Sequence, residues 1–348
     1  MQKGNASILF EKPPAVGCWG CIAGKKEAEG PLGGGLDRTE TDDRLGQETW
    51  EAAESELQRR TARLTLEKAG LKAADIRYLF AGDLLGQLTA TSFGVRELGI
   101  PLFGLYGACS TMGEAMALAA VMVHAGAADR VLAMASSHFA TAEKQFRFPL
   151  GYGAQRPSSA SWTVTGCGAV VVENRETAAG PETSGGCAVT IAGVTPGRIV
   201  DAGVRDSMNM GAAMAPAAAH TICRNLEDLQ TDLSYYDRII TGDLGEVGSR
   251  ALLDLLKKEG LDLEPVHADC GKEIYDRERQ DVHAGGSGSG CCAVTLCARI
   301  LPNLRAGIWK RVLFLPTGAL LSPVSFNEGR SVPGIAHGII LEARSPMD

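Results

Sequence analysis

The chain has 348 residues, of which 45% are hydrophobic and 22% are charged, with a formal net charge of −7. This composition fits a globular protein of one large domain or two smaller ones, and its acidic balance argues against a general nucleic-acid-binding protein. No stretch predicts a transmembrane helix, and residues 1–20 lack the apolar core of a signal peptide, so the ten scattered cysteines indicate a reduced, cytoplasmic-type setting.

The first half of the chain alternates between helical and strand-like segments. The expected elements are a helix at 42–69, strands at 76–81 and 101–106, a helix from just past 109 to about 124, and strands at 130–135 and 169–173. Thr111 and Glu114 have the spacing of a capping box, which places the start of the second helix directly after Cys109.

The second half repeats this order of elements. The expected elements are a helix at 209–229, a strand at 238–241, a helix at 249–259, a strand near 264–267, a helix at 291–304, and strands at 311–315 and 338–342. Strands that alternate with helices at this spacing predict parallel-rich sheets covered by helices.

Three short motifs occur twice, in the same order. Ala81-Gly82-Asp83-Leu84 is echoed by Thr241-Gly242-Asp243-Leu244, the segment 125–132 by 306–313, and the segment 169–173 by 338–342. Such a repeat predicts two fused copies of one α/β unit. We therefore expect two halves, 1–180 and 181–348, that pack as one body and form a site where they meet.

Cys109 is the sharpest candidate for chemistry. It lies in Gly107-Ala108-Cys109-Ser110, between an apolar strand and the predicted helix. This position directs the sulfur toward a helix N-terminus, where the partial positive charge favours the thiolate. The alternative is a small buried cysteine that packs under the helix, and the sequence leaves both open.

Two of the six histidines flank the corresponding region of the second half. His267 is expected to end a strand, and His283 directly precedes the glycine-rich run 285–290. Both are candidate partners of Cys109, with structural or surface roles as the alternative. Cys270 takes the repeat position of Cys109 and is interpreted as a packing residue. The glycine run lacks the Lys-Ser/Thr of a P-loop, so it predicts close approach of the backbone to a ligand or to the other half.

A basic segment follows the third strand. Residues 144–172 contain Lys144, Arg147 and Arg156 but no Asp or Glu, and His138 precedes them. Aromatic residues are interspersed, so this loop could stack on a planar ring and pair with its carboxylates; a solvated basic loop is the alternative. The Cys18-x-x-Cys21 pair has no second such pair to complete a structural zinc site, and no metal or other cofactor is predicted.

These features resemble a known group of proteins. The duplicated layout, the Gly-Ala-Cys-Ser elbow and the glycine-rich helix start resemble the thiolase and 3-oxoacyl synthase superfamily. Longer stretches resemble the stage V sporulation protein AD (SpoVAD) family: 80–85, 107–111, 136–143, 145–147, 210–219, 269–271, 284–288 and 317–323.

The resemblance implies an α/β, thiolase-like fold of two duplicated αβαβα-layered halves with mixed, mostly parallel sheets, usually paired as a homodimer. It implies a sporulation protein that binds dipicolinic acid (pyridine-2,6-dicarboxylate) for uptake into the developing spore. The expected partners are the membrane proteins of the SpoVA operon, with a soluble, cytoplasmic-type chain peripherally associated with the spore inner membrane.

The superfamily's enzymes acylate a cysteine at the position of Cys109, and His267 and His283 fall at or near the positions of their catalytic partners. The chain departs from the enzymes because 315–319 lacks the second catalytic cysteine and Asp269 stands where an asparagine is expected. A carboxylate there opposes an enolate or oxyanion. We therefore expect a converted ligand pocket, lined by Cys109, His138, Lys144, Arg147, Arg156, His267 and Asp269. The alternative is an acyltransferase with Cys109 as nucleophile.

Overall fold

The computed structural model describes residues 1–146, 156–174 and 186–344. Its main sheet contains two sets of five strands with the same order and the same senses. The first set is β3 (Ala15–Gly24), β9 (Gly166–Glu173), β7 (Arg130–Ser137), β5 (Tyr78–Gly82) and β6 (Leu102–Gly104). The second set is β10 (Ala188–Thr195), β17 (Gly338–Arg344), β14 (Arg311–Leu315), β11 (Arg238–Thr241) and β12 (His267–Asp269).

The two sets have matching pairings, as a duplication requires. In each set the first three strands pair antiparallel, and the remaining pairs are parallel. The sets join at β3 and β10 through one register pair, Ala15 with Thr190, which makes the sheet continuous. The expected mixed α/β sheet is therefore confirmed.

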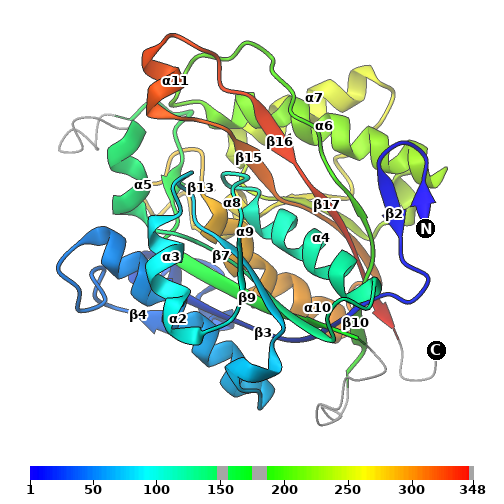
Figure 1. Cartoon of the computed structure of the whole chain (residues 1–348). Helices are drawn as coiled ribbons and strands as arrows, with labels where there is room; N and C mark the ends of the chain where they lie inside the picture. Colours follow the sequence, from blue (N-terminus) through cyan, green and yellow to red (C-terminus); the bar gives the residue numbers. More distant parts are fainter. Residues whose placement is uncertain (147–155, 175–185, 345–348) are drawn as a thin grey trace.

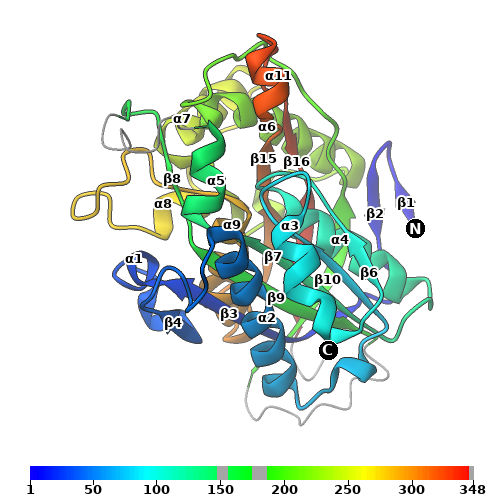
Figure 2. The same cartoon turned by 60° about the vertical axis from the view of Figure 1, so that its left-hand side comes forward.

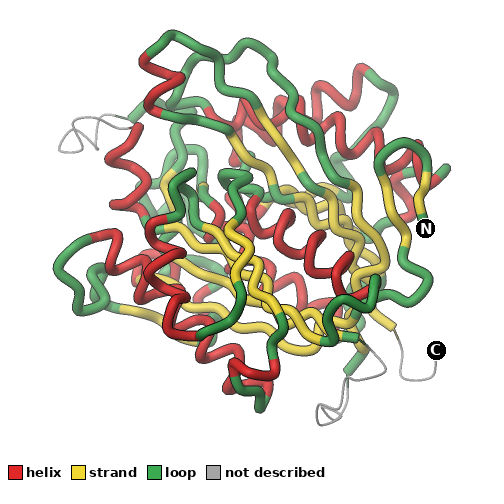
Figure 3. The backbone as a smooth tube through the Cα atoms, in the orientation of Figure 1, coloured by secondary structure: helices red, strands yellow, loops and turns green. Residues whose placement is uncertain are grey.

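Helices cover both sets and also separate them, which gives five layers (Figures 1 and 3). One outer layer is α2 (Trp50–Ala69) and α3 (Thr89–Val95), and the other is α6 (Met210–Leu229) and α7 (Gly245–Lys258). The central layer is α4 (Thr111–His124), α9 (Ser289–Thr295), a π-turn at Leu296–Ile300, and α10 (Leu301–Arg305). Three buried apolar clusters occupy the interfaces between these layers.

Short elements complete the chain. They are β1 (Gln2–Lys3), β2 (Ser7–Leu9), α1 (Lys25–Ala28), β4 (Arg38–Glu40), α5 (Phe139–Phe146), β8 (Trp162–Thr163), α8 (Cys270–Glu273), β13 (Gly286–Ser287), β15 (Thr317–Ala319), α11 (Pro323–Asn327) and β16 (Gly334–Ala336). The N-terminal hairpin β1–β2 packs on the second set of strands, because β2 pairs with β10 and Asp228 of α6 accepts the N–H groups of 5–7. The boundary expected near 180 lies outside the described residues. No helix in the described ranges is long and apolar enough to cross a membrane.

Most predicted elements form, with shifted ends. The helix expected from 42 begins only at Trp50, where the Thr49 hydroxyl accepts the Ala52 N–H. The helix after Cys109 begins at Thr111 as predicted, but Ser110 is its N-cap and makes no side-chain capping bond, so the capping box is wrong. The strand expected near 264–267 is instead β12, so His267 begins this strand and does not end it.

Candidate functional site

Cys109 lies at the turn between β6 and α4. Ala108 has a positive φ of 50°, an uncommon conformation for a residue with a side chain. Two hydroxyls close the turn: Ser110 Oγ donates to the Gly107 carbonyl at 2.6 Å, and Thr111 Oγ1 donates to the Ala108 carbonyl at 2.7 Å. The turn therefore fixes Cys109 one residue before the helix cap, with only 3% of the residue exposed.

Asp243 is the polar partner of Cys109, and it follows β11 of the second half. Its carboxylate lies near the Cys109 thiol and interacts with it electrostatically. Oδ2 also accepts from the Gly288 N–H at 2.8 Å and from Ser287 Oγ at 3.1 Å. Oδ1 accepts from Thr317 Oγ1 at 2.9 Å. Asp243 therefore holds together the cysteine turn, the glycine run and β15.

The glycine run 285–290 lets the second half approach the first. Gly288 has a φ of 103°, and a Cβ at this position would lie 2.7 Å from Ser137 Oγ at the end of β7. The Gly290 N–H donates to the same oxygen at 3.0 Å. The predicted close approach of this backbone to the other half is confirmed, and it places the start of α9 beside the start of α4.

The charge balance at Cys109 disfavours a thiolate. Burial raises the pKa of the Cys109 thiol well above its ordinary range, and the neighbouring Asp243 carboxylate raises it further. Burial also raises the pKa of Asp243, to about 6, against the donors that stabilise its charge. At neutral pH the pair is therefore a neutral thiol beside a carboxylate.

Two cavities that share lining residues lie near Cys109. A small cavity of about 50 Å³ touches the cysteine itself and is mostly apolar, with Tyr106, Phe146, Met210 and Leu321 among its lining residues. An adjoining cavity of about 480 Å³ shares Leu84, Leu85, Tyr106, Gln145, Leu321 and Pro323 with it. The larger cavity is also lined by the carboxyl groups of Glu51, Glu54 and Asp83.

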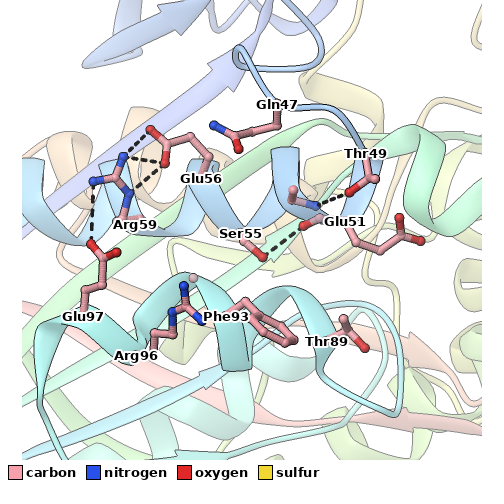
Figure 4. A pocket seen from close by; sticks show the side chains of 12 residues that line it. Gln47, Thr49, Glu51, Ser55, Glu56, Arg59, Thr89, Phe93, Arg96 and Glu97 are labelled. Carbon is pink, nitrogen blue, oxygen red and sulfur yellow. Dashed lines mark hydrogen bonds and ion pairs between the residues drawn. The ribbon is translucent and has the colours of Figure 1, made fainter.

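A further cavity of about 550 Å³ lies between α2 and α3 (Figure 4). Arg59 in this cavity pairs with Glu56 at 2.5 Å and approaches Glu97 at 4.0 Å. It shares Glu51 and Thr89 with the 480 Å³ cavity and no lining residue with the cavity at Cys109. We therefore do not count it as part of the cysteine site.

The predicted histidines do not line the cavity at Cys109. His267 Nε2 lies 3.0 Å from Thr241 Oγ1, and burial lowers its pKa to about 4. His283 contacts the Pro157 carbonyl at 2.9 Å and Asp281 at 3.1 Å. His138 is buried, and its Nε2 lies 2.7 Å from the Asp43 carbonyl. The sheet order explains why His267 does not line this cavity. His267 lies on the edge strand β12, whereas Asp243 follows the neighbouring strand β11.

The other predicted ligand residues are engaged elsewhere. Asp269 caps α8 and accepts N–H groups from Leu244 and Gly245 at 2.9 Å, so it shapes the loop that carries Asp243. Lys144 forms an ion pair with Glu51. Arg156 pairs with Asp281 at 2.7 Å and lies over the Trp162 ring at 5.0 Å. Arg147 lies outside the described residues.

Sequence reasoning missed Asp243 as a neighbour of Cys109, and Ser287 and Thr317 as the partners of Asp243. A signal for Asp243 was present, because Gly242-Asp243-Leu244 repeats Gly82-Asp83-Leu84. Asp83 directly follows β5, and Asp243 is the second residue after the corresponding strand β11. The prediction that Cys270 takes the repeat position of Cys109 is wrong. The helix of the second half that corresponds to α4 in the central layer is α9, not α8. The turn at 287–288, directly before α9, therefore corresponds to the turn at Cys109.

Comparison with known proteins identifies the family. The family model described as Stage V sporulation protein AD (SpoVAD) matches residues 4–342. The chain is 43% identical over 339 residues to Stage V sporulation protein AD of Bacillus subtilis (strain 168), with 97% of each chain covered. The chain belongs to the SpoVAD family. It is therefore a member of a family of sporulation proteins, as its motifs predicted.

Solved structures show that this SpoVAD-family chain has a thiolase-like fold. A single-residue variant of OleA of Xanthomonas campestris superposes with a TM-score of 0.60 at 15% identity, covering 96% of this chain and 100% of the other. A second variant of the same protein gives 0.58 at 15% identity, with 96% and 99% covered. AbyA1, a tetronic acid condensing enzyme, gives 0.52 at 19% identity, with 83% and 86% covered. At these identities the likeness concerns the fold alone.

Proposed function

We propose that the chain is a binding protein for a small planar dicarboxylate, with dipicolinic acid as the ligand that its family resemblance implies. The Asp243 carboxylate beside the Cys109 thiol is the observation that carries the choice of a binding protein. A carboxylate at the sulfur opposes both the thiolate needed for attack and the oxyanion that would follow. The central turn is therefore poorly suited to accept an acyl group, which favours a binding protein over an acyltransferase.

The shape of the cavity supports a flat ligand. Tyr106 and Phe146 supply aromatic surface, and Met210 and Leu321 supply apolar surface, at the cavity that touches Cys109. Ligand sites of this kind are mostly apolar, with a few polar groups that fix orientation. The Ser287 side chain and the Cys109 turn supply polar groups at the same place.

Calorimetric titration with dipicolinate tests the proposal. Met210→Trp should abolish saturable binding, because the larger side chain fills a cavity of about 50 Å³. Met208→Trp is the matched control: Met208 lines a neighbouring hollow but not the cavity at Cys109. No heat with the unmodified chain at millimolar dipicolinate, or equal binding by Met210→Trp, would reject this site.

The alternative is an acyltransferase that uses Cys109 as nucleophile, which the thiolase-like fold favours. Incubation with a panel of acyl-CoAs and measurement of the intact mass separates the two functions. We expect no adduct. An adduct that disappears in Cys109→Ser would support the enzyme and count against the binding protein.

We further propose that the chain acts as a homodimer, together with SpoVA membrane proteins, in dipicolinate uptake at the spore inner membrane. The exposed edge of β6 supports the dimer: Leu102 is 40% exposed and Phe103 is 45% exposed, at one end of the main sheet. An apolar edge strand of this kind is suited to pair with a second copy of itself.

A further inference from the structure

Two buried carboxyl groups lie beside the proposed ligand site, and they belong to one hydrogen-bond network. Glu54 of α2 is 2% exposed, and Asp83, which follows β5, is also 2% exposed. Both line the 480 Å³ cavity that adjoins the cavity at Cys109. A dicarboxylate held at Cys109 would therefore have two further carboxyl groups as neighbours.

The hydroxyl groups of the network point toward these carboxyls. Ser136 Oγ donates to Glu54 Oε1 at 2.8 Å, and Thr141 Oγ1 donates to Glu54 Oε2 at 2.5 Å. Thr91 Oγ1 donates to Asp83 Oδ2 at 2.7 Å. Gln58 connects the two ends, because its Nε2 donates to Ser136 Oγ at 2.8 Å and to Thr91 Oγ1 at 3.0 Å.

One acceptor in this network lacks a donor. These contacts fix the orientation of the Gln58 amide, since both hydroxyls already donate to carboxyls and can only accept from Nε2. Gln58 is fully buried, and its Oε1 has no hydrogen-bond partner among the described residues. A buried acceptor of this kind normally has a donor. In the described ranges no Lys or Arg side chain contacts Glu54 or Asp83, so these two buried carboxyls have no counter-charge, and a proton on one of them removes their mutual repulsion.

The surrounding charges also favour a protonated Glu54. Burial, together with the charges of Asp83 and Glu51, raises the pKa of Glu54 to about 8. Glu51 is paired with Lys144 of α5, and its pKa is lowered, so it stays ionised. Burial also raises the pKa of Asp83, lowers the pKa of His138 after β7, and raises the pKa of Cys167 of β9.

We propose that Glu54 sets the specificity of the cavity by holding a proton, so that the pocket accepts a dicarboxylate only while Glu54 is neutral. This role rests on the proposed function. The residues that line the cavity at Cys109 in the described part of the chain include no Lys or Arg. Neutralisation of Glu54 therefore removes a repulsion that no lining cation offsets, and ligand binding takes up a proton whenever Glu54 is ionised in the free protein.

Titration with dipicolinate at pH 7 and pH 9 tests this role, because the ligand stays a dianion over this range. With a Glu54 pKa of about 8 in the free protein, the affinity of the unmodified chain should fall about ten-fold between these two pH values. Glu54→Gln imitates the protonated group and should bind with the same affinity at both. Gln87→Ala is the control, because Gln87 lines the same cavity without a charge, and it should retain the ten-fold fall.

A second measurement keeps the test independent of absolute affinity. At pH 8, titrations in two buffers of different ionisation enthalpy should show uptake of about half a proton per ligand by the unmodified chain, and none by Glu54→Gln. Equal affinity at pH 7 and pH 9, or proton uptake that persists in Glu54→Gln, would overturn the role of Glu54 alone. Absence of binding by the unmodified chain at pH 7 would instead overturn the dicarboxylate site, and this role with it.

Discussion

Replacement of Asp243 by asparagine should make Cys109 more reactive. The substitution keeps the size of the side chain but removes the negative charge that contacts the thiol. Two unit charges about 4 Å apart repel by about 4 kcal/mol at an effective dielectric constant of about 20. The sulfur stays buried in the variant, and the asparagine amide leaves a donor such as the Gly288 N–H without a good acceptor. The thiolate therefore gains only part of this energy. We expect at least a ten-fold faster alkylation of Cys109, which corresponds to about 1.4 kcal/mol.

The assay is the rate of carbamidomethylation by iodoacetamide at pH 8, where Asp243, with a pKa of about 6, is ionised. The peptide that contains Cys109 is quantified by mass spectrometry, so the other nine cysteines do not interfere. Asp83→Asn is the matched control, because Asp83 occupies the repeat position of Asp243 and should leave the rate unchanged. An unchanged or slower rate in a folded Asp243→Asn chain would refute the conclusion that this carboxylate suppresses the thiolate.

Two further predictions concern assembly and stability. Leu102→Lys should convert a dimer to a monomer in light scattering, whereas Ile308→Lys, at an isolated position that is 66% exposed, should not; a monomeric unmodified chain would contradict the proposed dimer. Glu27 is buried, accepts a hydrogen bond from Tyr275, and has its pKa raised by burial from 4.5 to about 7. A raised carboxyl pKa means that the folded state binds the proton more tightly than the unfolded state does. The free energy of unfolding therefore falls as the pH rises from about 4.5 to 7, by about 3 kcal/mol in all. Glu27→Gln should remove this fall in urea denaturation between pH 5 and pH 7, and an identical slope in both chains would count against it.

The sequence determined the architecture to a large extent, because apolar periodicity is a local property. The strands 130–135 and 311–315 and the helices after 109 and 209 form close to their predicted ends. The repeated motifs predicted two copies of one unit, and the two strand sets have matching order and senses. The turn at Cys109 could also be predicted, because it depends on a strand, a short Gly-Ala-Cys-Ser segment and a helix that are adjacent in the chain.

The composition of the site depended on tertiary structure. His267 and Asp243 both follow or begin short strands of the second half, and local sequence does not decide which of them reaches Cys109. Strand order decides it: β11 lies between β12 and β14, so Asp243 at its end faces the central layer while His267 contacts Thr241 near the sheet edge. The polar neighbours of Cys109 that come from the second half are far away in the sequence, where no periodicity can predict a contact.

Packing also decided which charges of the basic segment 144–172 are neutralised. Lys144 and Arg156 stand in a segment without acidic residues, yet each pairs with a carboxylate from elsewhere in the chain, Glu51 and Asp281. Figure 2 shows α5, which carries Lys144, above α2, which carries Glu51. A local excess of charge therefore says little about the field at a site, because folding brings distant charges together. The sequence determined the frame and the cysteine turn, and only the tertiary structure placed a carboxylate against the sulfur.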